Sequence, residues 1–103
     1  MLEQEQENSI PAQYLLNSPH PNPFNPKTQI NFEVPEQSFL TISIYNLNGK
    51  LINVLTDKEY SSGRYQLDWN ADNQFGQVVS TGMYFVRFSS GAFNQTKKIL
   101  FLK

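Results

Sequence analysis

We expect the fold to be organised around the stretch His20-Pro21-Asn22-Pro23-Phe24-Asn25-Pro26. It places three prolines and two asparagines around Phe24, its only large apolar side chain. Proline fixes φ and removes a backbone donor, and the residue before each proline is pushed toward extended conformations, so no helix or central strand runs through this segment. We predict a rigid strap that buries Phe24 against core residues such as Trp69 or Tyr84.

The segments after the strap alternate between polar and apolar residues, which is typical of strands with one buried face. Residues 29–34 show the pattern without interruption, and it predicts a strand with Ile30, Phe32 and Val34 facing inward. The same pattern predicts strands at residues 40–45, 65–69, 83–88 and 96–102, and the short apolar run 14–16, which lies between prolines, predicts an edge strand. The segment Met83 to Phe88 is the most apolar of these, so we expect it to be central in its sheet.

The turns are marked by glycine and asparagine. Asn48-Gly49 predicts a type I′ hairpin turn into a strand over 50–55, and Ser89-Ser90-Gly91 predicts a turn before the last strand. Residues 70–80 predict a long loop in which Val78-Val79 forms a short pairing. About seven short strands separated by such turns predict an all-β fold, an immunoglobulin-like β-sandwich of antiparallel strands.

Length and composition indicate one domain with an N-terminal tail. Residues 1–10 are rich in Glu, Gln, Asn and Ser and predict a flexible linker, and residues 11–103 predict the folded domain. The chain has no cysteine and a formal net charge of -1, so a disulfide framework is excluded and general electrostatic binding of nucleic acid is not expected. The sequence contains no run long and apolar enough for a membrane span and no signal-peptide pattern, and we expect a monomer.

The residues that carry chemistry in other proteins form no convincing site here. His20 lies between two prolines with no second histidine or cysteine to share a metal, so we interpret it as an exposed loop residue. The carboxylate pairs Asp68/Asp72 and Asp57/Glu59 are interpreted as solvated strand and loop residues rather than as an acid and a base. Asp72-Asn73 with Gly76 has some of the oxygen ligands of a calcium loop but not its acidic density, and a turn-capping role is favoured. We expect no enzyme activity, no cofactor and no metal.

An ordered set of residues resembles the C-terminal type A sorting domain of type IX secretion substrates, in the form akin to the FlgD immunoglobulin-like domain. The resemblance runs from about Pro11 to Lys103. Thr81-Gly82-Met83-Tyr84-Phe85 and Leu67-Asp68-Trp69 are among its anchors, although Ser80-Thr81 stands where many such domains have a proline. The residues that match the family motif are Pro21, Asn22, Pro23, Phe24, Asn25, Pro26, Gly49, Trp69, Gly76, Gly82 and Tyr84.

The resemblance implies an export label without catalysis of its own. In that family the domain follows a cargo protein in secreted proteins of Bacteroidetes and related phyla, and it directs the cargo from the periplasm through the outer-membrane translocon of the type IX machinery. A sortase-like peptidase then typically removes the domain and attaches the cargo to the cell surface. The identity of the cargo, the cleavage position and the subtype of the machinery do not follow from this sequence. The alternative is a non-catalytic immunoglobulin-like spacer, adhesion or carbohydrate-contacting module of an extracellular enzyme.

The positive charge near the end of the chain suggests where such a label is recognised. The cations Arg87, Lys97, Lys98 and Lys103 are not accompanied by any acidic residue after Asp72. We therefore predict a recognition surface on the last strand and the turns near Gly82 and Gly91 that steers association with an acidic receptor. The alternative is that the lysines only protect an edge strand from aggregation.

Overall fold

The structure is a computed structural model of the chain, and it describes residues 10–103. Of the linker predicted for residues 1–10, all but Ile10 lies outside the described residues. The described part contains seven strands: β1 (Leu15–Leu16), β2 (Thr28–Val34), β3 (Ser38–Asn46), β4 (Leu51–Tyr60), β5 (Gly63–Trp69), β6 (Gly82–Ser90) and β7 (Phe93–Phe101). Within residues 10–103 there is no helix that has the length and apolar character to cross a membrane.

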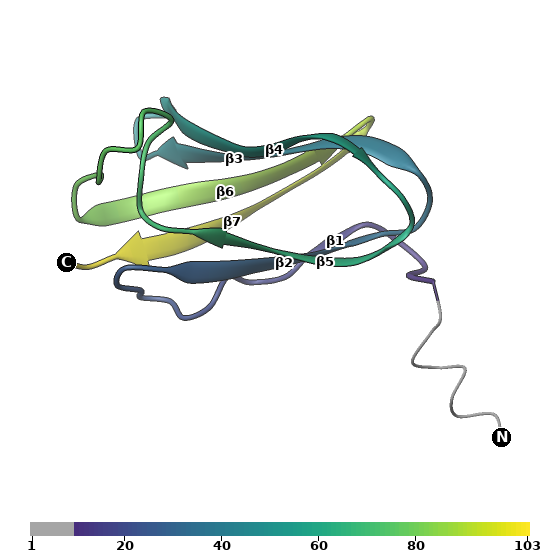
Figure 1. The fold of residues 1–103 in the computed structure, drawn as a ribbon, viewed down its shortest axis with the longest axis horizontal. Coiled ribbons are helices and arrows are strands. Elements are labelled where there is room, and N and C mark those ends of the chain that lie inside the picture. The colour runs from purple at the N-terminus through teal and green to yellow at the C-terminus, as the bar shows by residue number, and fades with distance from the viewer. Residues whose placement is uncertain (1–9) are drawn as a thin grey trace, which may run out of the picture.

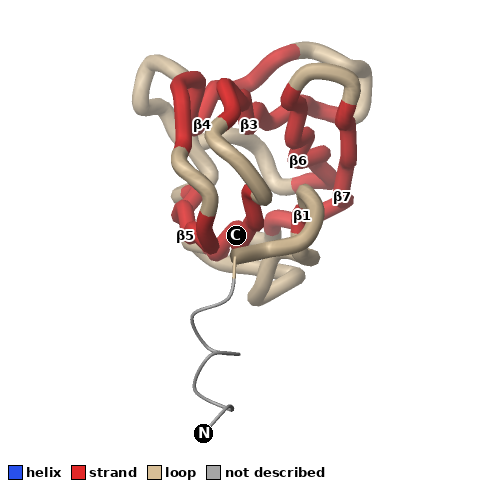
Figure 2. The backbone as a smooth tube through the Cα atoms, turned by 90° about the vertical axis from the view of Figure 1, so that its right-hand side faces the viewer, coloured by secondary structure: helices blue, strands red, loops and turns tan. Residues whose placement is uncertain are grey.

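The strands form two facing sheets, which confirms the predicted antiparallel β-sandwich (Figures 1 and 2). One sheet has three strands in the order β1-β2-β5, and the other has four in the order β4-β3-β6-β7. All neighbouring strands pair antiparallel. β6 lies between β3 and β7, so the predicted central position of this strand is correct.

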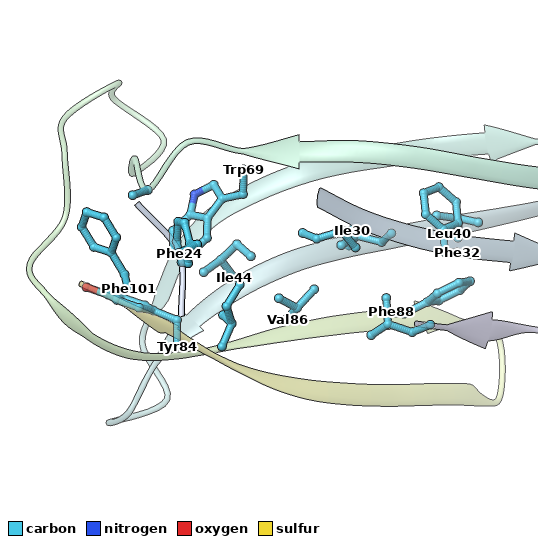
Figure 3. Packing of buried hydrophobic residues seen from close by; sticks show 14 of the residues in the cluster. Phe24, Ile30, Phe32, Leu40, Ile44, Trp69, Tyr84, Val86, Phe88 and Phe101 are labelled. Carbon is cyan, nitrogen blue, oxygen red and sulfur yellow. The ribbon is translucent and has the colours of Figure 1, made fainter. Parts of the chain in front are cut away.

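The apolar side chains that alternate with polar ones along the strands point inward and fill the space between the sheets. Buried and partly exposed residues alternate without error along β2, and Ile30, Phe32 and Val34 are the buried ones, as predicted. Val86 and Phe88 face them from the other sheet, and Figure 3 shows two groups of buried rings with aliphatic side chains such as Ile30, Ile44 and Val86 between them. Because the hydrophobic effect acts on both inner faces at once, a register slip of one residue in either sheet would expose this core.

The proline strap closes one end of the sandwich, and the prediction for Phe24 is confirmed. Phe24 is only 2% exposed, and its ring centroid lies 5.4 Å from that of Trp69 and 5.1 Å from that of Phe101. The strap also pairs with β7, because the Phe24 N–H donates to Leu100 O at 3.0 Å and the Leu102 N–H donates to Phe24 O at 3.2 Å. Figure 3 shows these rings gathered at one end of the core.

The β3–β4 turn differs from the predicted type I′ hairpin. That turn type needs positive φ at both Asn48 and Gly49, but only Gly49 has it, with φ 83°. The side chain of Asn46 explains the difference, because its Oδ1 accepts the N–H groups of Asn48 and Lys50, each at 2.9 Å. These bonds favour a type I turn over Asn46–Gly49 followed by a glycine bulge.

Two strand boundaries are also wrong in the sequence interpretation. β4 continues to Tyr60 rather than ending at Leu55, because its polar residues 57–59 still pair with β3. Ser89 and Ser90, which were predicted as part of a turn, belong to β6 and pair with Asn94 and Phe93. Backbone pairing therefore extends both hairpins past the point where apolar residues stop.

Candidate recognition surface

The β6–β7 hairpin carries the predicted surface, and Arg87 lies on its outward face. The residues of β6 that face the core are Tyr84, Val86 and Phe88, so Arg87 between them points away from it. Arg87 is exposed, and its Nη2 donates to Asn94 Oδ1 at 3.1 Å. This contact is neutral at the asparagine, so the guanidinium charge is available to a partner.

Lys97 and Lys98 lie on opposite faces of β7. Lys98 pairs with Phe85, points outward and is exposed. Lys97 shares the inward side of the strand with Ile99 and Phe101 and is half-buried at the edge of the sandwich. The period of two in a strand separates neighbours in this way, so only Lys98 shares the outward face with Arg87.

The remaining parts of the predicted surface lie at the two ends of the hairpin. Lys103 follows β7 and is exposed, and its backbone N–H donates to Thr81 Oγ1 at 3.1 Å, next to Gly82. Gly91 lies at the other end, in the turn between β6 and β7 (Figure 1). Within residues 10–103, none of the four predicted cations forms an ion pair. The structure therefore brings Arg87 and Lys98 together on one face, but the turns at Gly82 and Gly91 do not form one patch.

The outer edge of β7 is covered by the strap, which bears on the edge-protection alternative. Asn22 Oδ1 accepts the Leu100 N–H at 2.9 Å, and Asn22 Nδ2 donates to Lys98 O at 3.3 Å. The side-chain amide thus makes the two bonds that a neighbouring strand would make, and Phe24 continues the pairing toward Leu102. Because this part of the edge is already paired, it does not need lysines to keep other chains away.

The family-motif residues have structural roles that can be named. Pro21 O accepts the Thr28 hydroxyl at 2.9 Å, which anchors the start of the strap on β2. Trp69 is buried, and its Nε1–H donates to Asp72 O at 2.9 Å. Tyr84 is buried too, its hydroxyl donates to Ser80 O at 2.6 Å, and burial raises the pKa of this hydroxyl above its ordinary value. The sequence interpretation identified Trp69 and Tyr84 but not the backbone carbonyls that accept their hydrogen bonds. A buried tyrosine or tryptophan in a strand next to a polar loop suggests that such an acceptor lies in that loop.

The loop over residues 70–80 is held by Asn73, in keeping with the turn-capping interpretation. Asn73 Oδ1 accepts the N–H groups of Phe75 at 2.9 Å and Gln77 at 3.0 Å, and Gly76 has a left-handed φ of 81°. Asp72 Oδ1 accepts Asn53 Nδ2 at 3.2 Å, and a bridge between Asp72 and Val78 supplies the short pairing that was predicted. Residues 10–103 contain no group of three or more His, Cys, Asp or Glu side chains placed to hold a metal ion.

The other candidate residues also make ordinary structural contacts. His20 is exposed, as predicted, and its backbone pairs with Gln29. Asp57 accepts the Thr41 hydroxyl at 2.7 Å, and Asp68 lies 3.6 Å from Lys27 in an exposed ion pair. Both carboxylates are solvent-exposed, as the sequence interpretation of solvated strand and loop residues expects.

Comparison with known proteins gives a match over most of the chain. Residues 19–102 match the family model of the secretion system C-terminal sorting domain. A crystal structure of dimeric latent PorU from Porphyromonas gingivalis superposes with a TM-score of 0.67 at 15% identity, over 86% of this chain and 9% of that one. The structure of PorZ, a surface component of the type IX secretion system of the same organism, gives a TM-score of 0.53 at 16% identity, over 96% and 12%. No curated protein matches the chain. At these identities the two structures show a shared fold, and the chain spans only a small part of each.

Proposed function

Because the chain belongs to the family of secretion system C-terminal sorting domains, we propose that it directs a cargo protein through the type IX outer-membrane translocon. The observation that carries this function is the family match, which spans residues 19–102 of the 103. The cargo precedes the domain in the polypeptide and reaches the outside of the cell or its surface. The domain supplies the sorting signal and leaves any chemistry to its partners.

The readout of the signal is a surface of the folded domain. Arg87 and Lys98 are exposed on one face of the β4-β3-β6-β7 sheet. Lys97 is half-buried at the edge of the sandwich, and Lys103 follows the end of β7. Exposed cations on one side of a domain speed encounter with an acidic partner while adding little to stability. The exposed cations support the proposal that the receptor in the secretion machinery has carboxylates at its binding surface.

A second partner is a sortase-like peptidase that releases the domain from its cargo. We place the cleavage within residues 3–9 or just upstream of them, in the linker that the sequence predicts, because a peptidase needs an extended chain in its active site. The strands from β2 onward are hydrogen-bonded into the two sheets, so we expect the sandwich over residues 28–101 to resist cleavage. Residues 11–103 then leave as one folded unit.

The experiment that tests this function compares two positions of the domain in a periplasmic reporter. In one fusion residues 1–103 follow the reporter, and in the other they separate two halves of it. Expressed in a bacterium with a type IX system, the first fusion places the reporter on the cell surface and the second leaves it in the periplasm. If neither fusion is delivered although the domain is folded, the chain is a spacer of the adhesion or carbohydrate-contacting kind rather than a sorting signal.

A further inference from the structure

The outer faces of the two sheets differ in chemistry. On the three-stranded sheet, β2 and β5 present only polar side chains to solvent, in the cross-strand pairs Gln29 with Asp68, Asn31 with Gln66 and Glu33 with Arg64. A polar outer face opposite an apolar inner face is what an antiparallel sheet with one solvated side is expected to have. These two strands therefore follow the ordinary rule.

The four-stranded sheet breaks this rule near the end where the C terminus lies (Figure 1). Its register places Leu51 of β4 next to Tyr45 of β3, Tyr45 next to Phe85 of β6, and Phe85 next to Lys98 of β7. Met83 and Leu100 form the adjacent cross-strand pair. We call Tyr45, Leu51, Met83, Phe85 and Leu100 the apolar row.

The apolar row does not serve the core. Tyr45, Met83, Phe85 and Leu100 are half-buried, and Leu51 is 38% exposed. The core cluster and the partly buried side chains packed against it, as they occur within residues 10–103, include none of the five. Their exposure is therefore not explained by folding, and contiguous apolar patches of this kind mark interaction sites.

The charges around the apolar row indicate what covers it. Lys98 ends the row on β7, and Arg87 lies two residues from Phe85 on the same face of β6. No Asp or Glu occurs after Asp72, so neither strand of this hairpin supplies a counter-charge. Tyrosine, phenylalanine, methionine and arginine are the residues enriched at the centres of protein interfaces.

We propose that the apolar row docks on a partner protein whose surface has an apolar centre flanked by carboxylates. The inference deepens the proposed function, on which it rests, because it names the face by which the sorting domain is recognised. A second copy of this chain fits less well, since two rows placed face to face bring together the cations of both β6–β7 hairpins, which hold no acidic residue.

The row is tested by substitutions on the outward face of the folded domain. Phe85→Thr keeps a residue suited to a strand while removing the ring, and Arg87→Gln with Lys98→Gln removes the charges. The matched controls are Phe39→Thr, whose ring is 54% exposed at the other end of β3, and the double change Lys27→Gln, just before β2, with Arg64→Gln, in β5 of the opposite sheet. In the reporter fusion, Phe85→Thr and the double charge variant each lower surface delivery at least about tenfold with an unchanged melting temperature, whereas both controls deliver normally.

Several outcomes overturn the inference, and they differ from failure of the proposed function. Normal delivery by a folded Phe85→Thr domain shows that the apolar row is not read, although the chain remains a sorting signal. Should Phe85→Thr lower the melting temperature, the charge variant decides, and its normal delivery also overturns the inference. A purified domain that sediments as a dimer and becomes a monomer with Phe85→Thr assigns the row to a second copy, and binding to phosphatidylglycerol vesicles that Phe85→Thr abolishes assigns it to lipid. If the unsubstituted fusion is not delivered at all, the proposed function itself fails.

Discussion

Replacing Phe24 with alanine removes the side chain that ties the strap to the core. The ring is 2% exposed and packs against Trp69 and Phe101 at centroid distances of 5.4 and 5.1 Å. Loss of a buried phenylalanine ring costs about 3–5 kcal/mol through lost transfer energy and the cavity left behind. In Phe24→Ala the strap can move partly into the space that the ring leaves. We therefore expect a loss of stability near about 3 kcal/mol, at the lower end of this range.

The assay is thermal and chemical unfolding of the purified domain. For a domain of this size, about 1 kcal/mol corresponds to roughly 4–8 °C, so Phe24→Ala lowers the melting temperature by roughly 12–24 °C. Phe39→Ala is the control, since its ring is 54% exposed and its loss costs less than about 1 kcal/mol. A loss below about 1 kcal/mol for Phe24→Ala as well would refute the view that the strap organises the core.

Three further substitutions test individual contacts. Asn22→Ala removes the acceptor of the Leu100 N–H, so amide exchange at Leu100 accelerates while the global stability falls by about 1 kcal/mol; unchanged exchange would mean that the strap does not pair with β7 through this amide. Asn73→Ala removes the oxygen that accepts two backbone N–H groups of the 70–80 loop and costs about 1 kcal/mol in urea unfolding, whereas an unchanged midpoint would show that water replaces it. Burial raises the pKa of the Tyr84 hydroxyl, so the folded state keeps its proton at a pH where the unfolded chain loses it, and the stability of the fold declines as pH rises above about 10. Tyr84→Phe removes this part of the decline. Identical profiles of stability against pH for the two proteins would contradict the prediction.

Strand identity followed from the sequence wherever one face is buried and the other solvated. Ile30, Phe32 and Val34 lie inward as the alternation predicts, because the period of two in a strand fixes the faces once one of them is apolar. The same rule failed to give the full length of β4, since residues 57–59 are polar and only backbone pairing with β3 keeps them in the strand. A strand boundary that is set by backbone pairing alone leaves no signal in the pattern of apolar residues.

The candidate surface was predicted less completely than the fold. The sequence placed Lys97 and Lys98 in one cluster, but adjacent strand residues point to opposite faces, so only Lys98 joins Arg87. The pairing of Asn22 with β7 was missed because it joins residues 78 positions apart and uses a side chain in place of a strand. The apolar row was also missed, since it requires the register between three strand pairs that the sequence does not provide.

The central claim, that this folded domain is a sorting signal, is tested most directly by the fraction of a reporter that reaches the cell surface. A periplasmic reporter followed by residues 1–103 is expressed in a host with a type IX system and in the same host without its translocon, and surface reporter is measured on intact cells. We predict surface reporter in the first host and periplasmic reporter in the second. Equal surface fractions in the two hosts, or none in either with the domain folded, would contradict the claim.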